Sequence, residues 1–185
     1  MDSKHSKNNA VNLSIAYISV GSNLGDKTAN CGRGLDMLNM RSDTRVTAIS
    51  KTYRTAPVGF LDQDWFVNLA VKVETRLDPF QLLSVLQDIQ MHLGQGVKTV
   101  RFGPRLLDLD ILLFDLRIIK SQELTLPHPR MHHRRFVLRP LCDIDPGIVH
   151  PVFNEKVQVL LDNLNPGEQK IEAMPADNRL LNGTM

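Results

Sequence analysis

The 185-residue sequence has few cysteines and little charge imbalance, and both shortages narrow the possible classes of protein. Its two cysteines, Cys31 and Cys142, are too few for a disulfide framework and lack the C-x-x-C spacing, which indicates a reducing compartment. The 22 basic and 20 acidic residues leave a formal net charge of +2, which gives no support to nucleic-acid binding. The sequence also contains no internal repeat, heptad or low-complexity tract.

Long apolar runs are missing as well. The run over 13–20 is too short to cross a bilayer and lacks a convincing signal-peptide cleavage site. We therefore predict a cytoplasmic protein without a membrane partner. Its length suits one domain with a hydrophobic core, expected over 13–164, after a disordered leader over 1–12 and before a polar tail over 165–185. Monomer and homodimer stay open.

Hydrophobic periodicity predicts strands that alternate with helices. The expected strands are 14–20, 44–53, 65–74 and 108–114, with a short hairpin partner at 117–119. The expected helices are 26–40, 79–93, 131–142 and 155–164. Asp78 and Pro79 are typical of an N-cap followed by the first helical position. This pattern predicts one α+β sandwich.

Asp108 and Asp110 give the sharpest functional signal. They alternate with Leu109 and Ile111, so both carboxylates should leave one face of a sheet while the apolar side chains enter the core. Two charges about 5 Å apart repel by roughly 3 kcal/mol at an effective dielectric near 20, and magnesium is the natural cation to relieve this. Two exposed acids on an edge strand would show the same spacing, but the apolar neighbours favour a central strand.

Basic residues surround this pair in the sequence. Arg101 and Arg105 lie just upstream, and the stretch 126–136 adds His128, between two prolines, and Arg134. Arginines that bind phosphate oxygens beside carboxylates that bind Mg²⁺ are recurring parts of phosphotransfer sites. Zinc is disfavoured at the histidines of this stretch, because no cysteine accompanies them and their spacing is irregular.

Two further segments carry weaker signals. Gly-Ser-Asn-Leu-Gly over 21–25 is not a P-loop, since it lacks the terminal Gly-Lys-Ser/Thr. Asn68 lies on the same strand face as Phe66, and its amide could bind the edge of a heterocycle through both donor and acceptor.

Together these segments resemble the 6-hydroxymethyl-7,8-dihydropterin pyrophosphokinase family of folate biosynthesis. The resemblance extends from about 14 to 151 and rests on five segments: 16–26, 53–59, 66–68, 101–110 with its Arg-aromatic-Gly-Pro-Arg and Asp-x-Asp, and 126–131 with its Pro-His-Pro. It implies a ferredoxin-like α+β fold with a mainly antiparallel sheet. It also implies transfer of pyrophosphate from ATP to the pterin hydroxymethyl oxygen, with release of AMP.

The resemblance further implies roles for individual residues. Asp108 and Asp110 would bind two Mg²⁺ ions on the ATP phosphates. The residues matching positions around the triphosphate are Arg101, Arg105, His128 and Arg134, and those on the nucleotide side are Gln87, Phe102, Ile111 and Thr125. The pterin would stack between Phe66 and Phe136 and bond to Asn68 and to the main chain of Thr55 and Val58.

The sequence departs from the family pattern just upstream of the acids. Gln90 stands where the family usually has glutamate, and Gln95 and Val97 stand where it usually has arginines. Lys98 could replace one of the two missing cations. The loss of two charge-assisted contacts, roughly 1.5–3 kcal/mol each, would slow an enzyme of this kind without abolishing its activity.

Two other functions stay open at this point. Asp-x-Asp alone also suits a metal-dependent nucleotidyl- or glycosyltransferase of another fold. The altered loop residues would also suit a protein that binds ATP or pterin with weak or no turnover.

Overall fold

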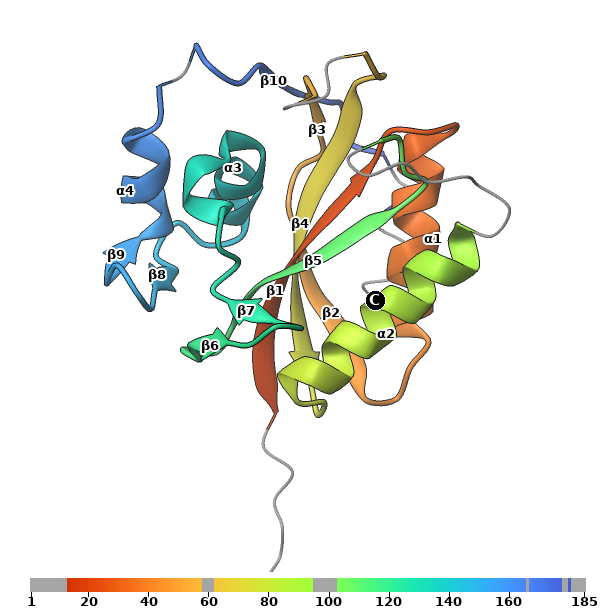
Figure 1. Cartoon of the computed structure of the whole chain (residues 1–185). Coiled ribbons are helices and arrows are strands. Elements are labelled where there is room, and N and C mark those ends of the chain that lie inside the picture. The colour runs from red at the N-terminus through yellow and green to blue at the C-terminus, as the bar shows by residue number, and fades with distance from the viewer. Residues whose placement is uncertain (1–12, 58–61, 95–102, 166, 178–179, 181–185) are drawn as a thin grey trace, which may run out of the picture.

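A six-stranded antiparallel sheet organises the chain (Figure 1). The computed structural model describes residues 13–57, 62–94, 103–165, 167–177 and 180. The strands are β1 (Ser14–Ser22), β2 (Thr44–Ile49), β3 (Tyr53–Thr55), β4 (Phe66–Thr75), β5 (Asp108–Phe114) and β10 (Ile171–Ala173). Their order is β10-β3-β4-β1-β5, and β2 also pairs with β4.

Helices cover both faces of the sheet, as Figure 1 shows. Helices α1 (Lys27–Asn39) and α2 (Pro79–Leu93) lie on one side, and α3 (Arg135–Ile144) and α4 (Val157–Asp162) lie on the other. The short elements are β6 (Ile119–Lys120), β7 (Thr125–Leu126), the 3-10 helix η1 (Met131–His133), β8 (Val149–His150) and β9 (Glu155–Lys156). The order β1-α1-β2-β4-α2-β5 confirms the predicted ferredoxin-like α+β fold.

Strand alternation produces two cores. Val20, Leu109 and Ile111 belong to the cluster on the α1/α2 side, whereas Ala70 and Leu112 belong to the cluster that packs on α3. Because successive side chains leave opposite faces, Asp108 and Asp110 share the α3 side with Leu112. The predicted arrangement of two carboxylates on one face is therefore confirmed.

The prediction that 108–114 forms a central strand was wrong. β5 lies at the end of the strand order and pairs with β1 alone among the described strands. It is apolar all the same, because residues of its two faces contribute to the two different cores. An apolar strand buried on both faces cannot be distinguished from a central one by composition.

Other boundaries also differ from the sequence predictions. The segment 44–53 splits into β2 and β3 around Ser50, whose side chain accepts the Ala70 N–H at 2.9 Å. β6 pairs with β7 in place of a hairpin with β5, and α4 is shorter than expected because 155–156 form β9. The segment expected to be a polar tail supplies β10, which pairs with β3, and Leu180, which is 6% exposed.

Helix α2 shows the predicted N-terminal signals. The Asp78 carboxylate accepts the N–H groups of Phe80 and Gln81 at 2.9 Å each, and the Gln81 side chain accepts the Asp78 N–H at 2.9 Å. Pro79 is the first helical residue. Such a capping box stabilises a helix by about 0.5–2 kcal/mol and fixes where α2 begins.

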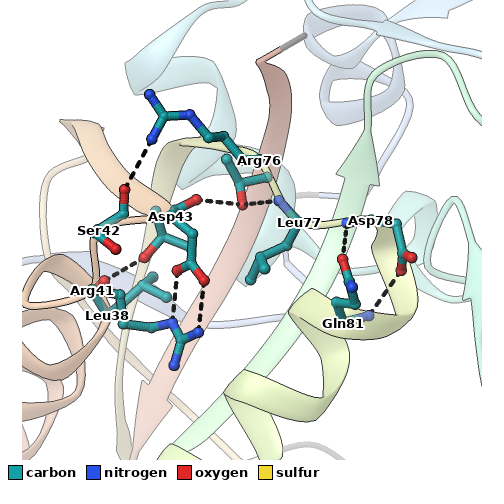
Figure 2. A network of polar contacts seen from close by, with 10 residues as sticks. Leu38, Arg41, Ser42, Asp43, Arg76, Leu77, Asp78 and Gln81 are labelled. Atoms are coloured by element: carbon teal, nitrogen blue, oxygen red, sulfur yellow. Dashed lines mark hydrogen bonds and ion pairs between the residues drawn. The ribbon is translucent and has the colours of Figure 1, made fainter. Parts of the chain in front are cut away.

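A polar network fixes one end of the sheet (Figure 2). The Asp43 carboxylate accepts two bonds from Arg41 at 2.9 and 2.8 Å, and its main-chain oxygen accepts the Arg76 N–H at 2.9 Å and the Thr75 hydroxyl at 3.0 Å. This network joins the α1–β2 turn to the β4–α2 turn. It lies at the end where β1 begins, whereas Asp108 pairs with Gly21 near the other end of β1.

Among the described residues, no helix has the length and apolar character needed to cross a membrane.

Candidate active site

Asp108 and Asp110 are held on β5 with their side chains partly accessible, 33% and 44% exposed. The Asp108 carboxylate accepts a bond from the Arg105 guanidinium. Burial and then the charge of Asp110 raise the pKa of Asp108, and Arg105 opposes this shift. The two acids therefore form a pair that a bound cation would stabilise.

Asn23 holds the main chain of Arg105. The Asn23 side-chain oxygen accepts the Arg105 N–H at 2.7 Å, and the Asn23 N–H donates to the Arg105 carbonyl at 3.1 Å. Asn23 is 1% exposed, and its side-chain nitrogen donates to Gln63 at 2.9 Å. The glycine-rich segment 21–25 thus positions an arginine through an asparagine. In the sequence Asn23 was only one residue of the Gly-Ser-Asn-Leu-Gly segment, and nothing there indicated a role for its side chain.

His128 faces the carboxylates as a neutral donor. Its Nδ1 accepts the Arg130 N–H at 3.2 Å, so the ring proton lies on Nε2, which is 3.9 Å from Asp110 Oδ2. Burial, with contributions from Arg134 and Arg130, lowers the pKa of His128 to about 4. The His128–Asp110 contact is therefore not an ion pair at neutral pH, and it is too long for a hydrogen bond.

Arg134 completes the charged part of the site. It precedes α3, and its guanidinium carbon lies 5.4 Å from the centre of the Phe136 ring. Burial and Arg130 lower the pKa of Arg134, while Asp110 and Asp108 act in the opposite direction. Arg105 and His128 thus lie beside the two acids, and Arg134 lies close enough for both acids to affect its pKa.

A second group of side chains lies on the same sheet face, on β3 and β4. Asn68 is 5% exposed, and its side-chain nitrogen donates to the Thr55 hydroxyl at 2.6 Å. A Cβ on Gly21 would lie 2.6 Å from Asn68 Oδ1, so glycine is needed for this close approach. Phe66 and Phe136 are half-buried. A cavity of about 290 Å³ opens beside Phe66 and is lined also by Lys27, Arg54, Trp65 and Met174, but not by Asp108 or Asp110.

The remaining predicted residues lie in different environments. Gln87 is exposed on α2, and Thr125 is half-buried on β7. Ile111 is 4% exposed within the α1/α2 core, so its side chain lies on the face opposite the carboxylates. The residues that lie outside the described part of the chain are Val58, Gln95, Val97, Lys98, Arg101 and Phe102.

Gln90 is a second residue whose role the sequence did not reveal. Its side-chain oxygen accepts the N–H of Leu109, between the two acids, at 2.7 Å. The sequence marks Gln90 only as a departure from the family pattern.

The donor set suits Mg²⁺ better than zinc. Within the described ranges, no three His, Cys, Asp or Glu side chains gather at a common metal position. Magnesium usually binds through one or two carboxylates, with phosphates and water completing its octahedral shell. Asp108 and Asp110 supply such a pair.

Comparison with known proteins identifies the family. Residues 17–146 match the family described as 7,8-dihydro-6-hydroxymethylpterin-pyrophosphokinase. The chain is 46% identical over 130 residues to 2-amino-4-hydroxy-6-hydroxymethyldihydropteridine pyrophosphokinase of Bacillus subtilis. The aligned region covers 70% of the chain and 77% of that protein. It is 40% identical over 158 residues to the protein of the same name from Methylorubrum extorquens, which covers 85% of the chain and 98% of that protein.

Longer relatives contain a similar region. The chain is 38% identical over 171 residues to folic acid synthesis protein fol1 of Schizosaccharomyces pombe, which covers 92% of the chain but 23% of that protein. Wild-type HPPK-DHPS of Plasmodium falciparum superimposes with a TM-score of 0.64 at 17% identity, over 82% of the chain and 43% of that protein, and so supports the fold. These matches confirm the predicted family and enzyme class, and none supports the alternative of a protein that binds ATP or pterin with weak or no turnover. The chain belongs to the 7,8-dihydro-6-hydroxymethylpterin-pyrophosphokinase family.

Proposed function

We propose that this chain transfers the pyrophosphoryl group of ATP to the hydroxymethyl oxygen of 6-hydroxymethyl-7,8-dihydropterin at the Asp108–Asp110 edge of the sheet. The observation that carries the proposal is the convergence of Arg105, His128 and Arg134 on this acid pair. The hydroxyl oxygen forms a bond to the β-phosphorus, the bond from that phosphorus to the α-phosphate bridging oxygen breaks, and AMP leaves. The hydroxyl proton is released to solvent.

Asp108 and Asp110 would hold two magnesium ions. Their carboxylates are hard oxygen ligands, and burial and then the charge of Asp110 raise the pKa of Asp108, so a bound cation would favour its ionised form. When bound, magnesium neutralises charge on the phosphate oxygens. Arg105 keeps Asp108 oriented through their ion pair.

Three arginines and one histidine would bind the triphosphate. Arg105 and Arg134 flank the acids, and Arg101 remains a prediction from the resemblance. The neutral His128 ring can donate a hydrogen bond from its Nε2–H to a phosphate oxygen and keeps its proton, because its pKa of about 4 leaves it uncharged at pH 7.

The nucleotide base and ribose are proposed to lie along the outer edge of β5. The Leu109 N–H points to that edge, and strand alternation directs the main-chain groups of Ile111 the same way. Ile111 would then act through its main chain, since its side chain is in the core. Gln87, Phe102 and Thr125 are proposed to contact the nucleotide as well.

The pterin site would be built on β3, β4 and α3. Asn68, oriented by Thr55 and by its close approach to Gly21, would bond to the pterin ring edge. Phe66 and Phe136 would stack on its faces, and the main chain of Thr55 and Val58 would supply further bonds. Arg134, packed over Phe136, would then lie between the pterin and the triphosphate.

Several expectations extend beyond the site. We propose a cytoplasmic location, consistent with two free thiols at Cys31 and Cys142. We also propose slower turnover than in members with two arginines at 95 and 97. The boundaries 13–164 remain a proposal for the domain, although Gln169 and β10 contact its sheet and helices.

The test is an AMP-release assay with ATP, Mg²⁺ and the reduced pterin. We expect activity in the wild type and a loss of about a hundredfold or more in Asp108→Ala, since metal-dependent charge stabilisation is worth several kcal/mol. Asp36→Ala, which removes an exposed acid on α1, should behave as the wild type. An inactive wild type, or full activity in folded Asp108→Ala, would refute the proposal.

A further inference from the structure

Gln169 connects the C-terminal segment to the main chain on both sides of Arg134. Its Oε1 accepts the Arg135 N–H at 2.8 Å, and its Nε2 donates to the His133 carbonyl at 2.8 Å. These two partners are the residues immediately before and after Arg134. One half-buried side chain thus bonds to both neighbours of a cation in the active site.

The bond to Arg135 replaces a missing local cap. Arg135 is the first residue of α3, and the N–H groups of a helix's first turn have no partner within the helix. Arg134 is the N-cap residue but its side chain makes no capping bond. An amide 34 residues further along the chain satisfies this donor instead.

The main chain of Arg134 is otherwise held by its own segment. Its N–H donates to the Met131 carbonyl at 3.1 Å, and its carbonyl accepts the N–H groups of Val137 and Leu138 at 3.0 Å each. The residue is extended, with φ −117° and ψ 103°, between η1 and α3. Bonds at 133 and 135 therefore constrain the peptide planes that set the direction of the Arg134 side chain.

The two residues after Gln169 bond at the end of β3, the strand that carries Thr55. The Lys170 carbonyl accepts the Ala56 N–H at 3.1 Å, and Ile171 pairs with Thr55 in the β10–β3 ladder. The segment 169–171 thus ties the main chain around Arg134 to the strand that carries Thr55. This segment lies beyond residues 17–146, the part of the chain that matches the family.

We propose that Gln169 is a positioning residue for Arg134 in pyrophosphoryl transfer. By holding the main chain on either side, it keeps the guanidinium directed at the Asp108–Asp110 pair when ATP binds. This inference rests on the proposed triphosphate-binding role of Arg134.

The first experiment compares variants of Gln169 by steady-state kinetics with ATP varied. Gln169→Leu removes both bonds, and Gln169→Glu keeps the acceptor for Arg135 but loses the donor to His133. We expect kcat/KM for ATP to fall about tenfold in Gln169→Leu and less in Gln169→Glu, because small misplacement of a positioned group is costly in rate. The control is Gln158→Leu, which removes a side-chain amide that donates to Asp162 on the same helix, α4. This variant should match the wild type.

The second experiment separates positioning from general weakening of the structure. In an Arg134→Ala background, Gln169→Leu should have little further effect on kcat/KM, because the group it orients is gone. A full tenfold loss in that background, or equality of Gln169→Leu and Gln158→Leu in the wild-type background, would overturn the inference.

The variants distinguish the role of Gln169 from the role of Arg134. If Arg134→Ala is impaired and Gln169→Leu is not, only the positioning role of Gln169 is refuted. If Arg134→Ala retains wild-type kcat/KM, the role of Arg134 itself is refuted and the inference falls with it. Gln169→Glu provides a folded variant if Gln169→Leu is too unstable to assay.

Discussion

The Gln90 side-chain oxygen accepts the Leu109 N–H at 2.7 Å, which joins the end of α2 to the β5 residue between Asp108 and Asp110. Leu109 is 3% exposed, and its N–H points away from β1 at the edge of the sheet. The His128 N–H donates to the Leu112 carbonyl at 2.9 Å along the same strand. Two contacts from outside the sheet thus occupy the outer edge of the strand that carries the acids, one at Leu109 and one at Leu112.

Loss of the Gln90 acceptor should destabilise the protein. Gln90→Leu leaves the buried Leu109 N–H without a partner, which costs about 1–3 kcal/mol. Gln90→Glu keeps an acceptor oxygen and should retain most of the stability. Urea unfolding measures both, with Gln87→Leu, at an exposed position of the same helix, as the control. Equal stability of Gln90→Leu and Gln87→Leu would show that the contact contributes nothing.

Gly21→Ala should impair pterin binding more than ATP binding. The added Cβ would lie 2.6 Å from Asn68 Oδ1, and Asn68 is held by Thr55, so the amide must shift or the strands must separate. We expect a rise in KM for the pterin, little change in KM for ATP, and a stability loss of about 1–3 kcal/mol.

A double variant tests the cause of this effect. Gly21→Ala with Asn68→Ala removes the atom that the new methyl group would meet. Its unfolding free energy should exceed the value expected from adding the two single losses. Strict additivity would contradict a direct clash between the two residues.

The local parts of the site were predictable, and the contacts that orient them were not. Asp108 and Asp110 could be placed on one face because strand alternation depends only on the sequence of β5. Its position at the sheet edge could not be read, because side chains of both its faces are buried and the sequence does not show which main-chain groups are paired. The bonds from Asn23 to Arg105 and from Gln169 to Arg135 span 82 and 34 residues, and an asparagine or glutamine in a polar segment carries no sign of such a partner.

His150 should make stability fall as the solution is acidified. Burial, then the neighbouring His132, lowers the pKa of His150 below its usual value of 6.5. The unfolded chain then binds a proton below pH 6.5 that the folded chain resists, so the stability present above pH 6.5 is lost as pH falls through the folded pKa. The slope cannot exceed about 1.4 kcal/mol per pH unit for one group.

A variant that does not titrate isolates the contribution of His150. Its Nδ1 accepts the N–H groups of Val152 and Phe153 at 3.3 Å each, and His150→Asn supplies an oxygen acceptor that does not titrate. Denaturant unfolding between pH 7.5 and 5 should show a shallower decline in His150→Asn than in the wild type or in His92→Asn, at an exposed position of α2. Parallel declines in all three proteins would exclude His150 as a cause.

Asp108→Asn should stabilise the ligand-free protein while it abolishes stabilisation by metal and nucleotide. Burial and the Asp110 charge raise the pKa of Asp108, so its ionised form opposes folding at pH values above the folded pKa. The neutral amide removes this cost and can still accept a bond from Arg105. Thermal unfolding at pH 7.5 should therefore give a higher Tm for ligand-free Asp108→Asn, by about 2–4 °C for each kcal/mol gained in a chain of this size.

Added Mg²⁺ and a non-hydrolysable ATP analogue should raise the Tm of the wild type and of Asp36→Asn but not that of Asp108→Asn. A lower Tm in the ligand-free variant would mean that the Arg105 ion pair outweighs the burial and the repulsion that disfavour ionised Asp108. An undiminished response to Mg²⁺ and nucleotide would remove Asp108 from the proposed metal site.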